Sequence, residues 1–163
     1  MTKLSWRTKS TNNWGSIQEA SSPGKCVSVD QIYSSTPGSI AQLKGKPTKQ
    51  RYRAATIFLN HHSDLTYMHL QRGFSSEDTI EARKVFESYS RMYRVIIKHY
   101  HAYNGRFADN AFQQSLTQEG QTITYCGVNA HFQNGKAETR IRDIQEQKRK
   151  QLHHTKLRWP IAI

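Results

Sequence analysis

The first half of the chain carries the patterns of β-strands. Residues 26–32 (CVSVDQI) partly alternate apolar and polar side chains, which predicts a short strand. Residues 52–60 and 65–71 are rich in residues that favour strands, and the polar turn between them at residues 61–64 predicts a hairpin. Residues 34–51 hold two prolines, two glycines and several lysines, so we expect a long connection or a hairpin loop there.

The second half alternates helical and strand-like patterns. Ser75 and Ser76 are candidate N-caps of a helix, because acidic residues follow them and apolar residues then recur at helical spacing. The short apolar run at residues 95–97 predicts a strand that is buried on both faces. Asp109 is expected to cap a second helix, which Gly120 ends.

The remaining elements complete an alternating order. Residues 121–126 have a strand-like pattern, and a highly charged helix then follows and is ended by Pro160. Three strands followed by helix, strand, helix, strand and helix predict an α/β domain, a mixed five-stranded sheet flanked by helices. Residues 1–24 are rich in Ser, Thr, Asn, Lys and Gly and are interpreted as a loose basic leader, with residues 25–163 forming one domain.

The distribution of charge narrows the class of partner. The chain of 163 residues has 24 basic and 12 acidic side chains, a formal net charge of +12. Residues 1–53 carry +7, residues 54–138 are neutral, and residues 139–163 carry +5. A neutral body with two basic flanks favours a polyanionic partner, of which nucleic acid is the commonest. A basic surface that serves only solubility is the alternative.

Other compositional features exclude several classes. No run is long and apolar enough for a membrane helix, and the first residues do not form a secretory signal. The two cysteines lie 100 positions apart, which fits a reduced, intracellular compartment. The cysteines and several histidines are types that bind metals but lack the spacing of a zinc site, so we expect surface or core roles for Cys26, Cys126, His61, His62, His99 and His101.

Two acidic residues stand where a sheet could present them for chemistry. Asp30 lies inside the first predicted strand, where a carboxylate is costly unless it binds a cation or has a partner. Glu138 follows Asn134 and Gly135 at the start of the last predicted helix. Each also has an ordinary explanation, since Asp30 could face water at a strand edge and Glu138 could complement the helix dipole.

Two longer motifs connect these acids. Residues 99–107 (HYHAYNGRF) and residues 129–138 (NAHFQNGKAE) resemble the two hallmark passages of the integrase catalytic core of copia-type retrotransposons. That family usually has Asp-Asn-Gly in the first passage and a Gln-Asn-Gly loop before the catalytic Glu in the second. Tyr103 and Glu138 lie 35 positions apart, which is the spacing of the family's last two triad acids. Residues 26–31 resemble its first strand, with Asp30 in the first triad position, and Asn60 stands where the family often has Asp.

The resemblance implies a fold and a chemistry. It implies a ribonuclease-H-like sheet in which three carboxylates hold two divalent cations, Mg²⁺ or Mn²⁺, for trimming DNA ends and transferring them into target DNA. Asp30 would be the ligand shared by both metals and Glu138 would complete one of them. The expected partners are DNA and further copies of the chain, with no membrane, and the nucleus is the implied location.

Tyr103 departs from the family's pattern. It occupies the second acid position, and a phenol with a pKa near 10 does not replace a carboxylate as a ligand of Mg²⁺. Asp109 lies six residues further on, but its predicted role as a helix cap argues against it as a substitute. The leading hypothesis is therefore a catalytically impaired integrase core. The alternatives are a non-catalytic DNA- or RNA-binding module retained from a transposable element, and a nuclease that works with two acids.

The last predicted helix carries the candidate DNA contacts. By the resemblance, basic residues of this helix contact DNA phosphates, as does one basic residue just before the candidate catalytic Glu. These residues are Lys136, Arg140, Lys148, Arg149 and Lys150. A solvated charged helix face is the alternative interpretation. The glycine at position 135 and Asn134 are expected to shape the loop before Glu138.

Overall fold

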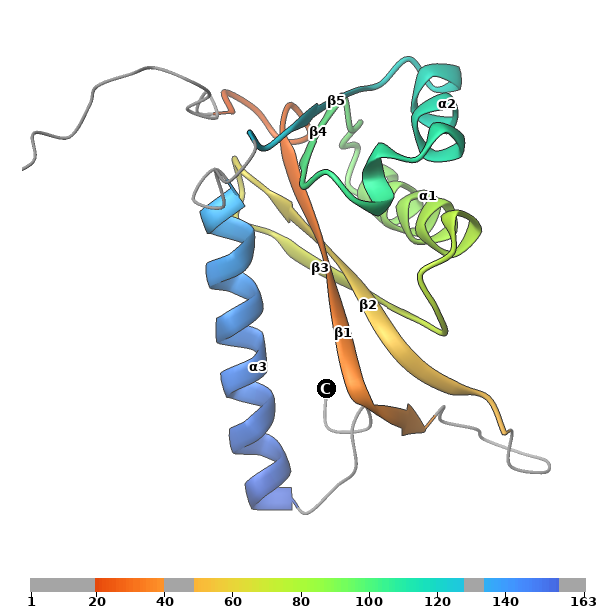
Figure 1. Cartoon of the computed structure of the whole chain (residues 1–163). Coiled ribbons are helices and arrows are strands. Elements are labelled where there is room, and N and C mark those ends of the chain that lie inside the picture. Colours follow the sequence, from red (N-terminus) through yellow and green to blue (C-terminus); the bar gives the residue numbers. More distant parts are fainter. Residues whose placement is uncertain (1–19, 40–48, 128–133, 156–163) are drawn as a thin grey trace, which may run out of the picture.

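A computed structural model of the chain describes residues 20–39, 49–127 and 134–155. Within them, five strands form one mixed sheet in the order β3-β2-β1-β4-β5 (Figure 1). The pairs β1–β2 and β2–β3 are antiparallel, and β1–β4 and β4–β5 are parallel. The strands are β1 Val27–Ser39, β2 Arg51–Asn60, β3 Thr66–Gln71, β4 His99–Ala102 and β5 Thr122–Tyr125. The predicted mixed five-stranded sheet is confirmed.

Helices cover both faces of the sheet. Helices α1 (Ser76–Met92) and α2 (Asn110–Gln118) lie on one face, and α3 (Gly135–Thr155) lies on the other and packs against β1 and β2 (Figure 1). A short 3₁₀-helix, Arg106–Ala108, precedes α2. No helix among the described residues has the length and apolar character needed to cross a bilayer.

The hydrophobic core lies between the sheet and the helices α1 and α2. Alternate residues of the central strands point into it, among them Val27, Val29, Phe58 and Tyr100, all at most 1% exposed. The ring of Phe86 from α1 stacks on Phe58 with centroids 4.5 Å apart. This packing fixes the ends of β1 and β4 beside each other.

A buried polar network crosses the same core. The Glu87 carboxylate Oε1 accepts hydrogen bonds from Arg83 Nη1 at 2.8 Å, Tyr100 Oη at 2.7 Å and Gln121 Nε2 at 2.9 Å. Arg83 also donates to the backbone carbonyl of Ser115 in α2. Arg83 and Glu87 are 1% and 4% exposed, so the network links α1, β4 and α2 inside the protein. Sequence reasoning missed it, since an i,i+4 pair on a helix resembles a surface ion pair.

The predicted helix caps are present. Ser75 caps α1: its side chain accepts from the backbone N–H of Asp78, and the Asp78 side chain accepts from the Ser75 N–H, which is a capping box. Asp109 caps α2 by accepting from the N–H of Ala111 at 3.0 Å. Gly120 follows the C-cap of α2 with φ +66°, a left-handed conformation that favours glycine.

Two strand assignments were wrong. Residues 34–39 belong to β1 and are not part of a loop; the pairing with β2 shifts between Tyr33 and Gly38, and this irregularity accommodates Pro37 and Gly38 inside a strand. The apolar run at residues 95–97 is not a strand, because it connects the end of α1 to β4. In it Ile97 is 3% exposed whereas Ile96 is 66% exposed, so the run is not buried on both faces.

The folded body also begins earlier than residue 25. Gly24 is buried, and its carbonyl accepts from the backbone N–H of Lys98 at 2.8 Å. Its φ is +81°, and a Cβ there would lie 2.2 Å from the carbonyl oxygen of Ile96, so only glycine fits. The carbonyl of Ala20 pairs with His62 Nδ1 at 2.9 Å. The rest of the predicted leader and Pro160 lie outside the described residues.

Candidate active site and nucleic-acid interface

The parallel pairing of β1 with β4 places two of the predicted site residues side by side. Val29 is in register with Ala102, so the next residues, Asp30 and Tyr103, lie side by side at the point where β4 ends and β1 continues. Asp30 is half-buried on β1, and Tyr103 is the first residue after β4. The carboxyl ends of adjacent parallel strands are the usual place for reactive groups in an α/β sheet.

Helix α3 brings the third residue to the same point. Glu138 lies in the first turn of α3, and the phenol Oη of Tyr103 donates a hydrogen bond to Glu138 Oε1 at 3.1 Å. Ala137, fully buried, anchors this first turn. The predicted convergence of Asp30, Tyr103 and Glu138 is therefore observed.

The electrostatics of the cluster follow from this geometry. Burial raises the pKa of Asp30 above its ordinary value; the N–H of Gln31, 2.7 Å from Asp30 Oδ1, opposes the shift, and the nearby charge of Glu138 adds to it. Desolvation, the hydrogen bond to Glu138 and the charges of both acids raise the pKa of Tyr103 to about 12. Tyr103 is therefore a neutral donor near pH 7 and does not supply an anionic oxygen.

The donor set does not fit two Mg²⁺ ions. A two-metal site needs several oxygen ligands, and bridging carboxylates neutralise the cations. Here two carboxylates flank a neutral phenol, and the described residues contain no group of three His, Cys, Asp or Glu side chains placed to hold a metal. Asp109 does not compensate, because it caps α2 and accepts a second hydrogen bond from Ser76 Oγ.

A cysteine and two histidines lie close to the acids on the same face. Cys126 follows β5, with its Sγ 3.4 Å from His101 Nε2, and burial foremost and then the charge of Asp30 raise its pKa. His61 Nε2 lies 2.7 Å from Ser28 Oγ, and burial lowers the pKa of this histidine. These side chains pair with neighbours on the sheet, in agreement with the surface or core roles expected for them. The proximity of Cys126 to Asp30 was missed; its position directly after a strand was the available signal.

The candidate DNA contacts on α3 point to different sides of the helix. Lys148 lies three turns from the buried Ala137, on the side that faces the sheet, and burial lowers its pKa to about 8. Arg149 lies three turns from Glu138, on the side of the acids, and is exposed. Arg142, one turn from Glu138, shares that side and is also exposed.

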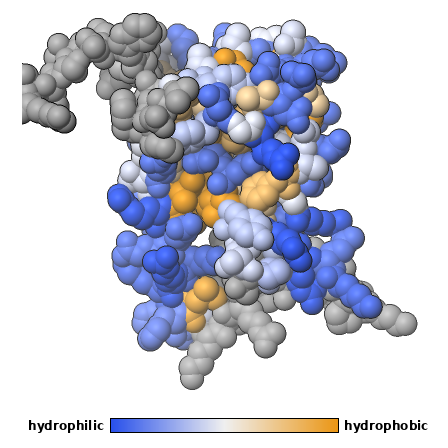
Figure 2. Space-filling model, in the orientation of Figure 1, coloured by the Kyte–Doolittle hydropathy of each residue, from blue (hydrophilic) through white to orange (hydrophobic). Residues whose placement is uncertain are grey.

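The remaining basic residues form a second group. Lys136 and Arg140 are one turn apart, and the charge of Lys136 lowers the pKa of His61 on the β2 side. Lys150 pairs with Glu146 at 3.0 Å in an exposed ion pair. Figure 2 shows the outer side of α3 as hydrophilic, with apolar surface where the helix faces the sheet. The exposed Arg142 and Arg149, on the side of Glu138, are the basic residues of α3 best placed to meet a phosphate backbone.

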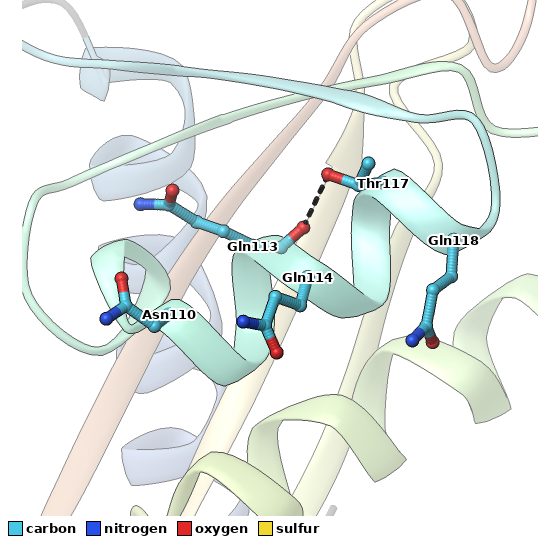
Figure 3. A pocket seen from close by; sticks show the side chains of 5 residues that line it. All are labelled: Asn110, Gln113, Gln114, Thr117 and Gln118. Atoms are coloured by element: carbon cyan, nitrogen blue, oxygen red, sulfur yellow. Dashed lines mark hydrogen bonds between the residues drawn. The ribbon is translucent and has the colours of Figure 1, made fainter.

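The described residues also form a polar hollow of about 410 Å³ at α2, on the face of the sheet opposite α3 (Figure 1). It is lined by one face of α2, Asn110, Gln113, Gln114, Thr117 and Gln118 (Figure 3). None of these side chains is charged, and none comes from the elements that carry the acids. The hollow therefore contributes nothing to the candidate active site.

Comparisons with known proteins identify the fold. No protein-family model and no curated protein matches the sequence. Among solved structures, the chain resembles the integrase of a simian T-cell lymphotropic virus intasome in complex with the PP2A regulatory subunit B56 gamma, at TM-score 0.73 and 14% identity, covering 91% of this chain and 48% of that one. It therefore spans about half the length of that protein.

Two isolated catalytic cores give the same result. The HTLV-2 integrase catalytic core domain in complex with magnesium matches at TM-score 0.59 and 17% identity, over 82% of this chain and 74% of that one. The BIV integrase catalytic core domain matches at TM-score 0.57 and 14% identity, over 80% and 73%. The chain has the ribonuclease-H-like fold of retroviral integrase catalytic cores, which confirms the predicted fold.

Proposed function

We propose that the chain is a retrotransposon integrase core, of the copia type, that binds DNA and has lost metal-dependent phosphodiester transfer. One observation carries the loss of catalysis: the Tyr103 phenol donates to Glu138 where a third carboxylate would have to hold a cation. The hydrogen bond gives Glu138 a partner that competes with a metal. Asp30 and Glu138 keep their positions, so the site is altered at one residue.

The DNA-binding part of the proposal rests on charge. The chain carries +12, and α3 presents Arg142 and Arg149 on the side of Glu138. Basic side chains that contact phosphates bind duplex DNA with little dependence on its sequence. Binding releases counterions from the DNA, so the affinity falls as the salt concentration rises. The nucleus as its location and Mg²⁺ as its ancestral cation are parts of the same proposal.

Two assays on one preparation of the full chain test the proposal. Binding to unrelated duplexes is measured at several salt concentrations, and nicking or joining of the same duplexes is measured with Mg²⁺ and with Mn²⁺. We expect salt-dependent binding of similar strength for all duplexes and no cleavage or joining. Robust metal-dependent activity of the unmodified protein would overturn the loss of catalysis, and absence of binding at low salt would overturn the DNA-binding role.

A further inference from the structure

A histidine and a cysteine from neighbouring strands meet on the face of the sheet that carries α3. His101 Nε2 lies 3.4 Å from Cys126 Sγ, and the two residues are 6% and 3% exposed. They are 25 positions apart in the sequence. The register of β4 with β5 places His101 opposite Thr124, and Cys126, two residues further on, lies on the same face as Thr124. Spacing along the chain therefore gives no signal of this pair.

A chain of hydrogen bonds along β4 and β5 sets which nitrogen of His101 faces the thiol. It begins at the backbone carbonyl of Lys98, which can only accept and takes a hydrogen bond from Thr122 Oγ1. The Thr122 oxygen accepts from His99 Nδ1 at 2.8 Å, and His99 Nε2 then accepts from Thr124 Oγ1 at 2.9 Å, because burial lowers the pKa of His99 and keeps its ring neutral. The Thr124 oxygen accepts from His101 Nδ1 at 2.9 Å. His101 therefore presents the lone pair of Nε2 to the thiol.

The separation of the two side chains fits a shared zinc ion. Zn²⁺ binds an imidazole nitrogen at about 2.0–2.1 Å and a thiolate at about 2.3 Å, so two such ligands at a tetrahedral angle lie about 3.5 Å apart. The observed distance between His101 Nε2 and Cys126 Sγ is 3.4 Å. A histidine that binds a metal also donates its other N–H to a neighbouring group, and here this group is the Thr124 hydroxyl.

The surroundings of the pair are acidic. Burial foremost, and then the charges of Asp30 and Glu138, raise the pKa of Cys126. Within residues 20–39, 49–127 and 134–155, neither carboxylate takes part in an ion pair. An imidazole and a thiol beside two carboxylates that lack ion-pair partners favour a bound cation. The thiolate selects a softer ion than Mg²⁺.

We propose that His101 and Cys126 bind a zinc ion, with water at its remaining coordination positions. Water is expected there because the described residues hold no group of three metal-binding side chains. The ion would link the end of β5 to β4 and stabilise the folded protein, since it binds the folded state in preference to the unfolded one. The inference does not rest on the proposed function, because neither DNA binding nor the loss of phosphodiester transfer enters the argument.

Absorption spectroscopy of the full chain with Co²⁺ as the probe tests the proposal. We expect a charge-transfer band from a thiolate ligand, and Zn²⁺ should displace it. Cys126→Ser should abolish the band. Cys26→Ser is the matched control, because Cys26 is the other buried cysteine and should leave the band unchanged. The unfolding transition of each variant verifies that it is folded. Absence of the band from the unmodified protein, or a band that survives Cys126→Ser, overturns the proposal.

The role of the hydrogen-bonded chain is tested by the affinity for Zn²⁺ itself, measured by competition with a chelator. Thr124→Val removes the acceptor that orients His101 and should weaken the affinity about tenfold or more. Thr117→Val makes the same change on the exposed face of α2 (Figure 3) and should leave the affinity unchanged. Zinc might bind the acids alone, and its affinity would then fall with Glu138→Gln and not with Cys126→Ser, which would contradict the assignment.

Discussion

The two faces of the sheet each carry a polar cluster, and the two clusters are built in opposite ways. On the α1 face, Glu87 accepts from Arg83, Tyr100 and Gln121 inside the core. On the α3 face, Tyr103 donates to a Glu138 that is exposed. A buried charge is tolerated only when its hydrogen-bonding capacity is met, so the first cluster is structural. The second keeps an exposed carboxylate of α3 beside the end of β4, which is the arrangement of a site.

The largest expected effect is a gain of catalysis on the α3 face. Tyr103→Asp places a carboxylate between Asp30 and Glu138 and supplies the missing ligand for a divalent cation. We expect metal-dependent nicking or joining of DNA to change from undetectable to measurable with Mg²⁺ or Mn²⁺. A further Asp30→Asn or Glu138→Gln change should abolish it.

The matched control is Tyr103→Asn, which removes the phenol without adding charge and should remain inactive. A Tyr103→Asp protein that is folded, judged by its unfolding transition, and yet inactive would show that Tyr103 is not the main lesion. The distinction between the structural cluster around Glu87 and the site-like cluster around Glu138 would then rest on their geometry, without support from catalysis.

The next effect is a loss of stability on the α1 face. Glu87→Ala leaves the Arg83 guanidinium buried without its carboxylate, and breaking a buried pair in this way costs about 3–5 kcal/mol. Tyr103→Phe removes one exposed hydrogen bond and should cost at most about 1 kcal/mol. Both values are measured as free energies of unfolding in denaturant. Glu119→Ala, at an exposed ion pair, is the control and should change stability little. If Glu87→Ala and Tyr103→Phe lowered the free energy of unfolding equally, the distinction between a structural cluster and a site-like cluster would be contradicted.

These two clusters also show what sequence could and could not predict. The helix caps at Ser75 and Asp109 and the hairpin turn at residues 61–64 were predicted, because each depends on neighbours within a few residues. The position of β4 was predicted wrongly. Its residues, His99 to Ala102, alternate polar and less polar side chains, which is a strand pattern. The more apolar run at residues 95–97 just before it obscured this pattern.

The site was predictable where the chain topology dictates it. Asp30 and Tyr103 meet because β4 ends beside the early part of the parallel strand β1, and a family-like spacing then indicates Glu138. The side of α3 on which each basic residue lies depends on which residue of the helix is buried. In the structure this residue is Ala137, and the sequence does not reveal it. Lys148 was therefore grouped with Arg149 although the two point in different directions. The buried contacts of Glu87 required the packed core to be known.

A smaller effect concerns DNA binding by α3. Arg149→Ala should reduce the slope of log affinity against log salt by about 0.9, the value for one phosphate contact. Lys84→Ala removes an exposed charge from α1, on the other face, and should leave the slope unchanged. Lys148→Ala should change it less than Arg149→Ala, because Lys148 faces the sheet. Fluorescence anisotropy of a labelled duplex across a salt series measures all three, and equal slopes for every variant would assign the charges of α3 to solubility.

The smallest effect is a pH dependence that originates at Asp30. Burial raises the pKa of this carboxyl in the folded protein above its ordinary value of about 3.9. The folded state therefore binds the proton more tightly than the unfolded state, so the contribution of Asp30 to stability is fully present below the ordinary value. This contribution is lost as the pH rises through the pKa of Asp30 in the folded protein.

Asp30→Asn removes the titration, so the stability of the variant relative to the unmodified protein should increase between about pH 3.5 and pH 7. Denaturant unfolding of both proteins across this range measures the difference. The two proteins could instead differ in free energy of unfolding by the same amount at every pH. Asp30 would then be solvated as freely as an ordinary surface acid, and the two clusters would differ less than their geometry indicates.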